Sequence, residues 1–215
     1  ESTEHWFIAT MVPGSNPIQE LTEALLSVAT DNDAVTFDPE FKDEKSLSRI
    51  AQQLYKDTQS TILLFIDQFE EIFTLVEDEA ERRYFLNNIA HAVNDPESNL
   101  RIILTLRADL YDRPLLYADF GQLIQQHTEV ILPLSPNELE HTITNPAQKV
   151  GVEIHRDLVV QIIADVMEQP GALPLLQYTL TELFDKRSDS VIPLEDYLAT
   201  GGISGTLASR ADDIY

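Results

Sequence analysis

Three carboxylates follow the most apolar run of the chain. Ile62–Ile66 contains only Leu, Ile and Phe side chains, and Asp67 comes directly after it, with Glu70 and Glu71 three and four residues further on. A carboxylate at the end of a buried strand suits Mg2+, which keeps several water ligands and needs only one or two protein carboxylates. If the chain turns helical after Asp67, the two glutamates lie near it and could orient or deprotonate a water molecule. The alternative is that Asp67 caps this helix and the glutamates occupy its favourable first turn.

A basic residue follows a second apolar run. Arg101–Leu106 leads into Arg107, with Asp109 two residues later. The carboxyl ends of parallel strands meet at one edge of a sheet, where the ligands of open α/β folds bind. A guanidinium at that edge suits forked contact with phosphate oxygens, although an ion pair with a nearby carboxylate is the alternative. Together the two patterns favour a phosphate-bearing ligand with Mg2+.

The elements that must position these residues alternate between strand and helix. Apolar runs predict four strands, which are Trp6–Val12, Ile62–Ile66, Arg101–Leu106 and Val130–Leu134. Helical apolar spacing lies between the first three, and the alternation predicts an α/β fold with a parallel sheet and right-handed crossovers. The second and third runs are apolar enough to be buried on both faces.

Helical patterns alone follow the fourth run. Ser135–Glu138 has the pattern of a capping box with proline at the first helical position. Two further apolar stripes predict helices on either side of the break at Pro170-Gly171. We therefore divide the chain into an α/β core over residues 1–134, a helical domain over 135–190 and the start of a third unit over 191–215.

Composition narrows the classes of partner. The 215 residues include 14 Lys and Arg but 37 Asp and Glu, for a net charge of −23, which disfavours direct contact with nucleic acid. There is no cysteine, so disulfides and thiolate metal sites are excluded, and no histidines lie three or four residues apart as zinc ligands would. No apolar run is long enough for a membrane span, and no signal segment opens the chain. We expect a cytoplasmic protein.

Four motifs resemble those of a known family. They are LLFIDQFEEIF at Leu63–Phe73, TLRAD at Thr105–Asp109, PGALPLL at Pro170–Leu176, and Tyr197–Leu207 with its Gly201-Gly202 pair. In this order they resemble the STAND signal-transduction NTPases, and most closely the bacterial branch called novel STAND type 1, whose members are often fused to WD-type repeats. The resemblance covers nearly the whole chain.

The resemblance implies a fold and a set of roles. It implies part of a P-loop NTPase core, then a helical domain, then a winged helix, with ATP or ADP and Mg2+ as ligands. Asp67 matches the Walker B acid that coordinates Mg2+. Glu71 matches the acid that activates water, with Glu70 as its alternate. Arg107 matches the sensor near the γ-phosphate, and Pro174 matches the proline that touches the adenine side.

The chain departs from the family in two places. Two residues separate Gly171 from Pro174 where many relatives have one, which weakens Gly171 as a contact. No GxxxxGKS or GxxxxGKT phosphate loop is present. The family carries that loop after a first strand upstream of the segment at His5, so we expect this piece alone to be inactive and the full-length protein to be the ATPase. Because that strand normally separates Arg101–Leu106 from Val130–Leu134, we expect these two to pair directly here.

Two functions remain as hypotheses. The first is a nucleotide-gated switch, in which Mg-ATP binding and hydrolysis in the full-length protein control conformation and self-association or contact with other protein domains. The second is a non-catalytic scaffold that keeps the NTPase fold for protein contacts, which the missing phosphate loop favours. Neither predicts contact with nucleic acid or membrane.

Overall fold

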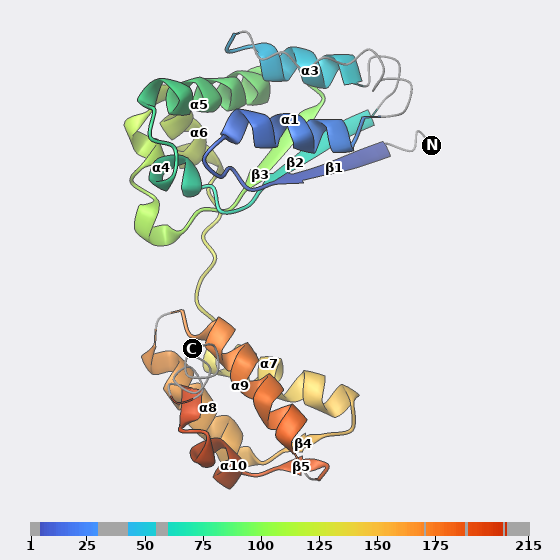
Figure 1. Ribbon diagram of the computed structural model, residues 1–215, viewed down its shortest axis with the longest axis vertical. Coiled ribbons are helices and arrows are strands. Elements are labelled where there is room, and N and C mark those ends of the chain that lie inside the picture. Colours follow the sequence, from blue (N-terminus) through green and yellow to red (C-terminus); the bar gives the residue numbers. More distant parts are fainter. Residues whose placement is uncertain are drawn as a thin grey trace. The chain divides into compact units, whose positions relative to one another are not determined.

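The chain forms two compact units, Glu1–Glu129 and Val130–Tyr215, in a computed structural model (Figure 1). The structure describes residues 5–29, 43–54, 60–169, 171–187, 189–203 and 205. None of the helices in these ranges is both long enough and apolar enough to cross a membrane.

The first unit contains a three-stranded parallel sheet. Its strands are β1 (His5–Met11), β2 (Ser60–Ile66) and β3 (Leu100–Leu104), and they lie in the order β1-β2-β3. The first three predicted strands are confirmed, with ends that differ from the prediction by at most two residues. The register pairs Phe7 with Ile62 and Ile62 with Leu100, so these side chains share one face.

The helices of this unit lie between successive strands, except the last helix, which follows β3. They are α1 (Pro17–Ser27), α3 (Ser46–Leu54), α4 (Glu71–Thr74), α5 (Glu79–Asn94) and α6 (Ala118–His127), with short 3-10 turns η1 (Ala108–Leu110) and η2 (Pro114–Leu116). Proline at the first position starts α1, and the Asp78 side chain accepts a hydrogen bond from the Ala80 N–H to cap α5.

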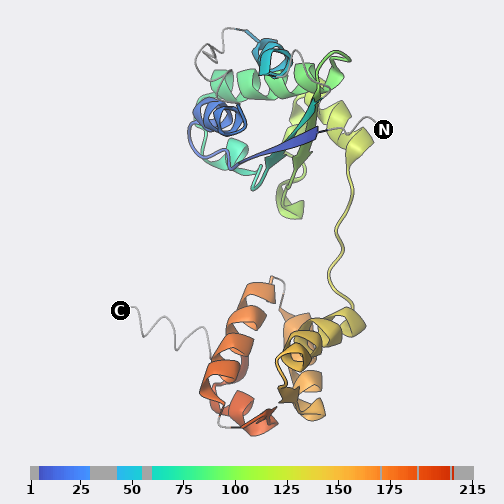
Figure 2. The ribbon, with the colours of Figure 1, turned by 90° about the vertical axis from the view of Figure 1, so that its right-hand side faces the viewer.

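One face of the sheet carries the hydrophobic core. Ile62, Leu64 and Ile66 of β2 are fully buried on this face, and α1, α3 and α5 gather on that side of the sheet (Figure 2). Phe69 lies just beyond the strand, also fully buried, and stacks on Phe120 of α6 at 5.4 Å between ring centroids. The core therefore anchors the segment that follows Asp67.

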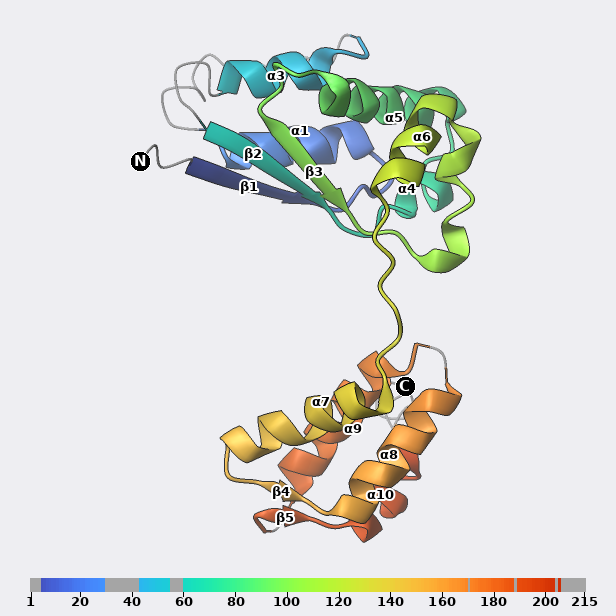
Figure 3. The same cartoon turned by 180° about the vertical axis from the view of Figure 1, so that it is seen from behind.

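The opposite face is largely uncovered in the part of the chain that the structure describes (Figure 3). Trp6, Ile8 and Ile103 on this face are 51%, 61% and 52% exposed, whereas Leu63 and Phe65 are half-buried. The prediction that the second and third strands are buried on both faces is therefore wrong for the described residues. Parallel sheets are ordinarily covered on both sides, so this bare apolar face is unusual.

The fourth predicted strand does not form. Residues 130–134 adopt no regular structure, and Val130, Ile131 and Leu132 are exposed. The expected pairing of this segment with β3 is wrong as well, because β3 is an edge strand with β2 as its partner among the described residues. β-propensity reflects how well a side chain fits a pleated, half-buried surface, and this apolar run has no neighbouring strand to provide one.

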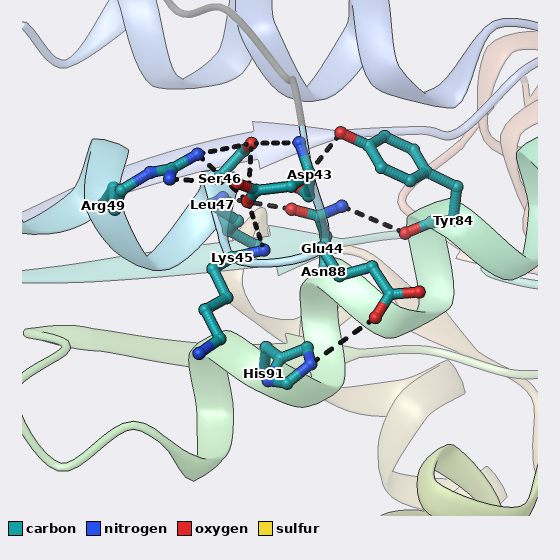
Figure 4. A network of polar contacts seen from close by, with 9 residues as sticks. All are labelled: Asp43, Glu44, Lys45, Ser46, Leu47, Arg49, Tyr84, Asn88 and His91. Carbon is teal, nitrogen blue, oxygen red and sulfur yellow. Dashed lines mark hydrogen bonds and ion pairs between the residues drawn. The ribbon is translucent and has the colours of Figure 1, made fainter.

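A polar network fastens α3 to α5 (Figure 4). The Asn88 side chain, fully buried, accepts a hydrogen bond from the Leu47 N–H at 3.1 Å and donates one to the Tyr84 carbonyl at 3.1 Å. Arg49 makes a two-pronged contact with Asp43, 3.0 Å for each bond. Because α5 leads into β3 and α3 precedes β2, this network holds together two connections of the sheet.

The second unit is mainly helical. It contains α7 (Pro136–Lys149), α8 (Arg156–Glu168), α9 (Leu173–Lys186) and α10 (Leu194–Ala199), and β4 (Glu153–Ile154) pairs in parallel with β5 (Val191–Ile192). The capping box at Ser135 and Glu138 is confirmed. The two short strands were not predicted, because two residues are too few to show a strand pattern.

A buried tyrosine organises the end of this unit. Tyr197 is 1% exposed, and its hydroxyl donates a hydrogen bond to Asp165 of α8 and accepts one from the Ile203 N–H. Gly201 and Gly202 between them have φ of +78° and +70°, the left-handed region that glycine enters without steric cost. The tyrosine and the glycine pair thus fold the chain back onto α8.

Candidate functional site

Asp67 lies where the sequence predicts, at the carboxyl end of the central strand. Its backbone N–H donates to the Met11 carbonyl of β1 at 2.9 Å, which continues the sheet ladder by one residue. Its side-chain Oδ1 accepts a hydrogen bond from the Thr105 hydroxyl at 2.5 Å and from the Gln68 N–H at 3.0 Å. Asp67 does not cap α4, because that helix begins at Glu71 with Glu70 as its N-cap residue and no side-chain cap bond.

The turn after Asp67 is strained. Gln68 has φ of +51°, the only positive value at a non-glycine residue in the described chain. Its N–H also donates to the Thr105 hydroxyl at 3.0 Å, and the Phe69 N–H donates to the Thr105 carbonyl at 3.0 Å. Thr105 therefore fixes both the carboxylate and the backbone that follows it. The left-handed conformation costs about 1–2 kcal/mol for a residue with a side chain.

Glu71 reaches a different strand end. Its Oε2 accepts a hydrogen bond from the Gly14 N–H at 2.9 Å, in the loop between β1 and α1. Gly14 has φ of +60°, and a Cβ there would meet no atom within 4 Å, so conformation rather than space favours glycine. Three strand ends thus contribute to the site. The side chain of Glu70 makes no hydrogen bond within the described chain but lies close enough for its charge to act on Arg107.

Arg107 is paired with its neighbour Asp109. Its Nε and Nη2 donate to the two carboxylate oxygens of Asp109 at 3.0 and 2.8 Å, and both side chains are about two-thirds exposed. This hydrogen-bonded pairing raises the pKa of Arg107 and lowers that of Asp109. The guanidinium lies at the carboxyl edge of the sheet, but in this structure its fork is directed at a carboxylate of its own loop.

The site fits Mg2+ only as a partly hydrated ion. Among the described residues, no three His, Asp or Glu side chains lie close enough together to hold a metal. No hydrogen bond from the described chain reaches Oδ2 of Asp67, and the side chain is half-buried rather than enclosed. One free carboxylate oxygen is sufficient for a cation that takes its other ligands from water and phosphate.

Pro174 belongs to the second unit. It occupies the first turn of α9, where its missing N–H leaves no helical hydrogen bond unmade, and it is exposed. Gly171 has φ of +77° and open space around it, so the turn itself requires glycine there.

Two contributors escaped the sequence analysis. Thr105 lay within a recognised motif but received no role, and Gly14 carried no signal beyond the turn-forming Pro-Gly pair. The strand-end position of Thr105, shared with Asp67 on the neighbouring strand, is the signal that could have identified it.

A comparison with known protein families identifies the family of this chain. The family model for Novel STAND NTPase 1 matches residues 1–215, the whole of the chain. The chain belongs to the Novel STAND NTPase 1 family. No curated protein matches the sequence. Membership in an NTPase family implies nucleotide binding in general, and the observed α/β unit, with a small parallel sheet flanked by helices, agrees with part of a P-loop NTPase fold.

Proposed function

We propose that this STAND NTPase chain supplies the Mg2+ and water-activating side of an ATP site. ATP binding and hydrolysis in the full-length protein then act as a switch that controls conformation and self-association. The observation that carries the proposal is Asp67, which ends the central strand and is oriented by the Thr105 hydroxyl at 2.5 Å. A carboxylate held in this way at the ligand-binding edge of a parallel sheet is poised to meet a hydrated cation.

Each residue has a defined task in this proposal. Bound Mg2+ would neutralise charge on the phosphates, and Asp67 would hold it through its free oxygen. Glu71 would accept a proton from the attacking water, with Glu70 as the alternate base. Arg107 would exchange Asp109 for a phosphate oxygen, since a guanidinium binds either with the same fork. By family resemblance, Pro174 would contact the adenine side of the nucleotide.

Among the described residues, the outer edge of β3 and one face of the sheet are bare, which supports the idea that further chain completes the site. The crossovers from β1 to β2 and from β2 to β3 run in one direction, so right-handed connections bring their helices to one face. A phosphate-loop strand beside β3, connected back to β1, would run in the other direction. Its helix would then cover the face that carries Trp6, Ile8 and Ile103, as a parallel sheet requires.

A scaffold function remains the second candidate. The engagement of Arg107 by Asp109 favours it, because the guanidinium is then not directed at a phosphate. A scaffold would keep the fold and its surfaces without any turnover of nucleotide.

The deciding experiment uses the full-length protein with its natural N-terminus. Asp67→Asn should lower Mg2+-dependent ATP hydrolysis by about a hundredfold or more, because the amide no longer attracts the cation. Asp119→Asn on α6 is the matched control, since this exposed aspartate has no hydrogen-bonding partner in the described chain. Unchanged turnover in Asp67→Asn would refute the role proposed for Asp67, and no hydrolysis in the wild type would favour the scaffold.

A further inference from the structure

The helix that carries Glu71 cannot position itself. α4 spans only Glu71–Thr74, a single turn, and its N-cap residue Glu70 makes no side-chain cap bond. One isolated turn fixes several backbone dihedrals for very few hydrogen bonds and is unstable alone. The location of the Glu71 carboxylate must therefore depend on contacts from elsewhere in the fold.

Arg82 of α5 provides these contacts. Its Nε donates to the Ile72 carbonyl at 2.9 Å, and its Nη2 donates to the Val76 carbonyl. Ile72 is the second residue of α4 and Val76 lies two residues beyond the helix, and the last carbonyls of a helix lack helical partners, so a cation beside them is favourable. The Arg82 side chain is only 18% exposed, so these bonds are partly shielded from water.

The guanidinium is itself held in place. Its Nη1 donates to Oε2 of Glu79 at 2.6 Å, and the same oxygen accepts from the Tyr117 hydroxyl at 3.0 Å. Tyr117 comes directly before α6, and its ring packs on Phe73 of α4 with 6.1 Å between centroids. The network therefore ties α4 to α5 and to the segment after β3.

We propose that Arg82 is a positioning residue for Glu71. By fastening the Ile72 carbonyl within α4 and the Val76 carbonyl just beyond it, Arg82 keeps the helix where the Glu71 carboxylate meets the Gly14 N–H. Arg82 contacts no reacting group itself. Its effect on hydrolysis rests on the function proposed above, whereas its effect on the Glu71–Gly14 contact does not.

The neighbouring arginine provides a matched control. Arg83 also binds Glu79, at 3.1 Å, but it is 61% exposed and donates to no carbonyl of α4. Arg82→Ala and Arg83→Ala therefore remove the same charge from adjacent positions, and only the first removes the bonds to Ile72 and Val76.

The first measurement is amide hydrogen exchange in the full-length protein. Arg82→Ala should speed exchange of the Gly14 N–H about tenfold, because the bond to Glu71 loses its fixed acceptor, while amides inside β2 keep their protection. Arg83→Ala should leave Gly14 unchanged. Equal effects of the two variants, or an unchanged Gly14, would overturn the proposal. If Arg82→Ala loosens β2 as well, Arg82→Gln is measured by the same criteria.

The second measurement is ATP hydrolysis by the same proteins. Arg82→Ala should lower kcat about tenfold or more with KM for ATP nearly unchanged, because the base is misplaced but the nucleotide contacts remain. Arg82→Lys should recover part of kcat. Faster exchange at Gly14 with unchanged kcat would refute the catalytic consequence, provided that Asp67→Asn is inactive. If Asp67→Asn is active, the proposed function fails. The exchange of the Gly14 N–H then decides by itself whether Arg82 positions Glu71.

Discussion

Thr105 donates a hydrogen bond from its hydroxyl to Oδ1 of Asp67 at 2.5 Å, across two adjacent strand ends. The same hydroxyl accepts from the Gln68 N–H at 3.0 Å, so a single side chain sets the direction of the carboxylate and the path of the turn. The other carboxylate oxygen is left free of hydrogen bonds from the described chain. This arrangement fixes the direction of the Asp67 carboxylate, as the metal-binding role proposed for it requires.

Replacement of Thr105 by valine tests this orientation. Thr105→Val keeps the shape of the side chain but removes the hydroxyl, and it should reduce Mg2+ affinity or hydrolysis in the full-length protein by about tenfold or more. The measurement is the rate of ATP hydrolysis against Mg2+ concentration. Thr10→Val on β1 is the control, because Thr10 is also exposed on this sheet and its hydroxyl has no partner within the described chain. An identical Mg2+ dependence in both variants would contradict the prediction.

The strained turn predicts a substitution that stabilises the protein. Gln68→Gly should raise the free energy of unfolding of the α/β unit by up to about 1 kcal/mol, since glycine tolerates φ of +51° and the strain exceeds the added chain entropy. Gln122→Gly, in the middle of α6, should lower it by about 1 kcal/mol. Urea unfolding midpoints compare the two. A loss of stability in both variants would show that Gln68 makes a compensating contribution.

The Arg82 network predicts a loss of stability in acid. Burial pushes the pKa of Glu79 upward, but hydrogen bonds from Tyr117 and Arg83 and the charge of Arg82 outweigh it, and the pKa lies below its usual 4.5. A carboxyl with a lowered pKa in the folded state contributes stability that is present above its unfolded pKa and is lost as pH falls through the folded pKa. Between pH 5 and 3, wild type should therefore lose more stability than Glu79→Gln. Equal losses of unfolding free energy in wild type and Glu79→Gln over this pH range would contradict the prediction.

The second unit predicts a loss of stability in alkali. Burial, and then the hydrogen bond to Asp165 and the charge of that carboxylate, raise the pKa of Tyr197 far above its usual 10.0. A phenol whose pKa is raised in the folded state contributes its full stabilisation of that state at pH values below its unfolded pKa. This contribution declines as the pH rises above about 10. Tyr197→Phe should cost about 1–3 kcal/mol at neutral pH, because the Ile203 N–H loses its acceptor, and should flatten the alkaline decline. Circular dichroism of unfolding against pH provides the measurement.

The sequence correctly predicted the structural features that depend on neighbouring residues. An apolar run that stops at a carboxylate located Asp67, and the spacing of Ser135 and Glu138 located the start of α7. Both predictions depend on residues that are close together in the chain, so the local sequence pattern is enough to identify them.

Prediction failed where distant residues decide. The Glu71 carboxylate meets Gly14, 57 residues away, and no pattern near either residue indicates the contact. Val130–Leu134 has strand-forming side chains, but a strand needs a neighbouring backbone, which sequence periodicity does not provide. The sequence left two partners open for Arg107, a phosphate or a nearby carboxylate, because a guanidinium binds both with the same forked geometry. The structure shows the carboxylate of Asp109.

The uncovered sheet face gives the protein its own optical reporter. Trp6 is the only tryptophan in the chain, and its indole is about half exposed on that face. Any polypeptide that covers the face must exclude water from this ring, so its fluorescence emission would shift to shorter wavelength and become less accessible to a soluble quencher. One intrinsic chromophore can thereby follow completion of the sheet without a label.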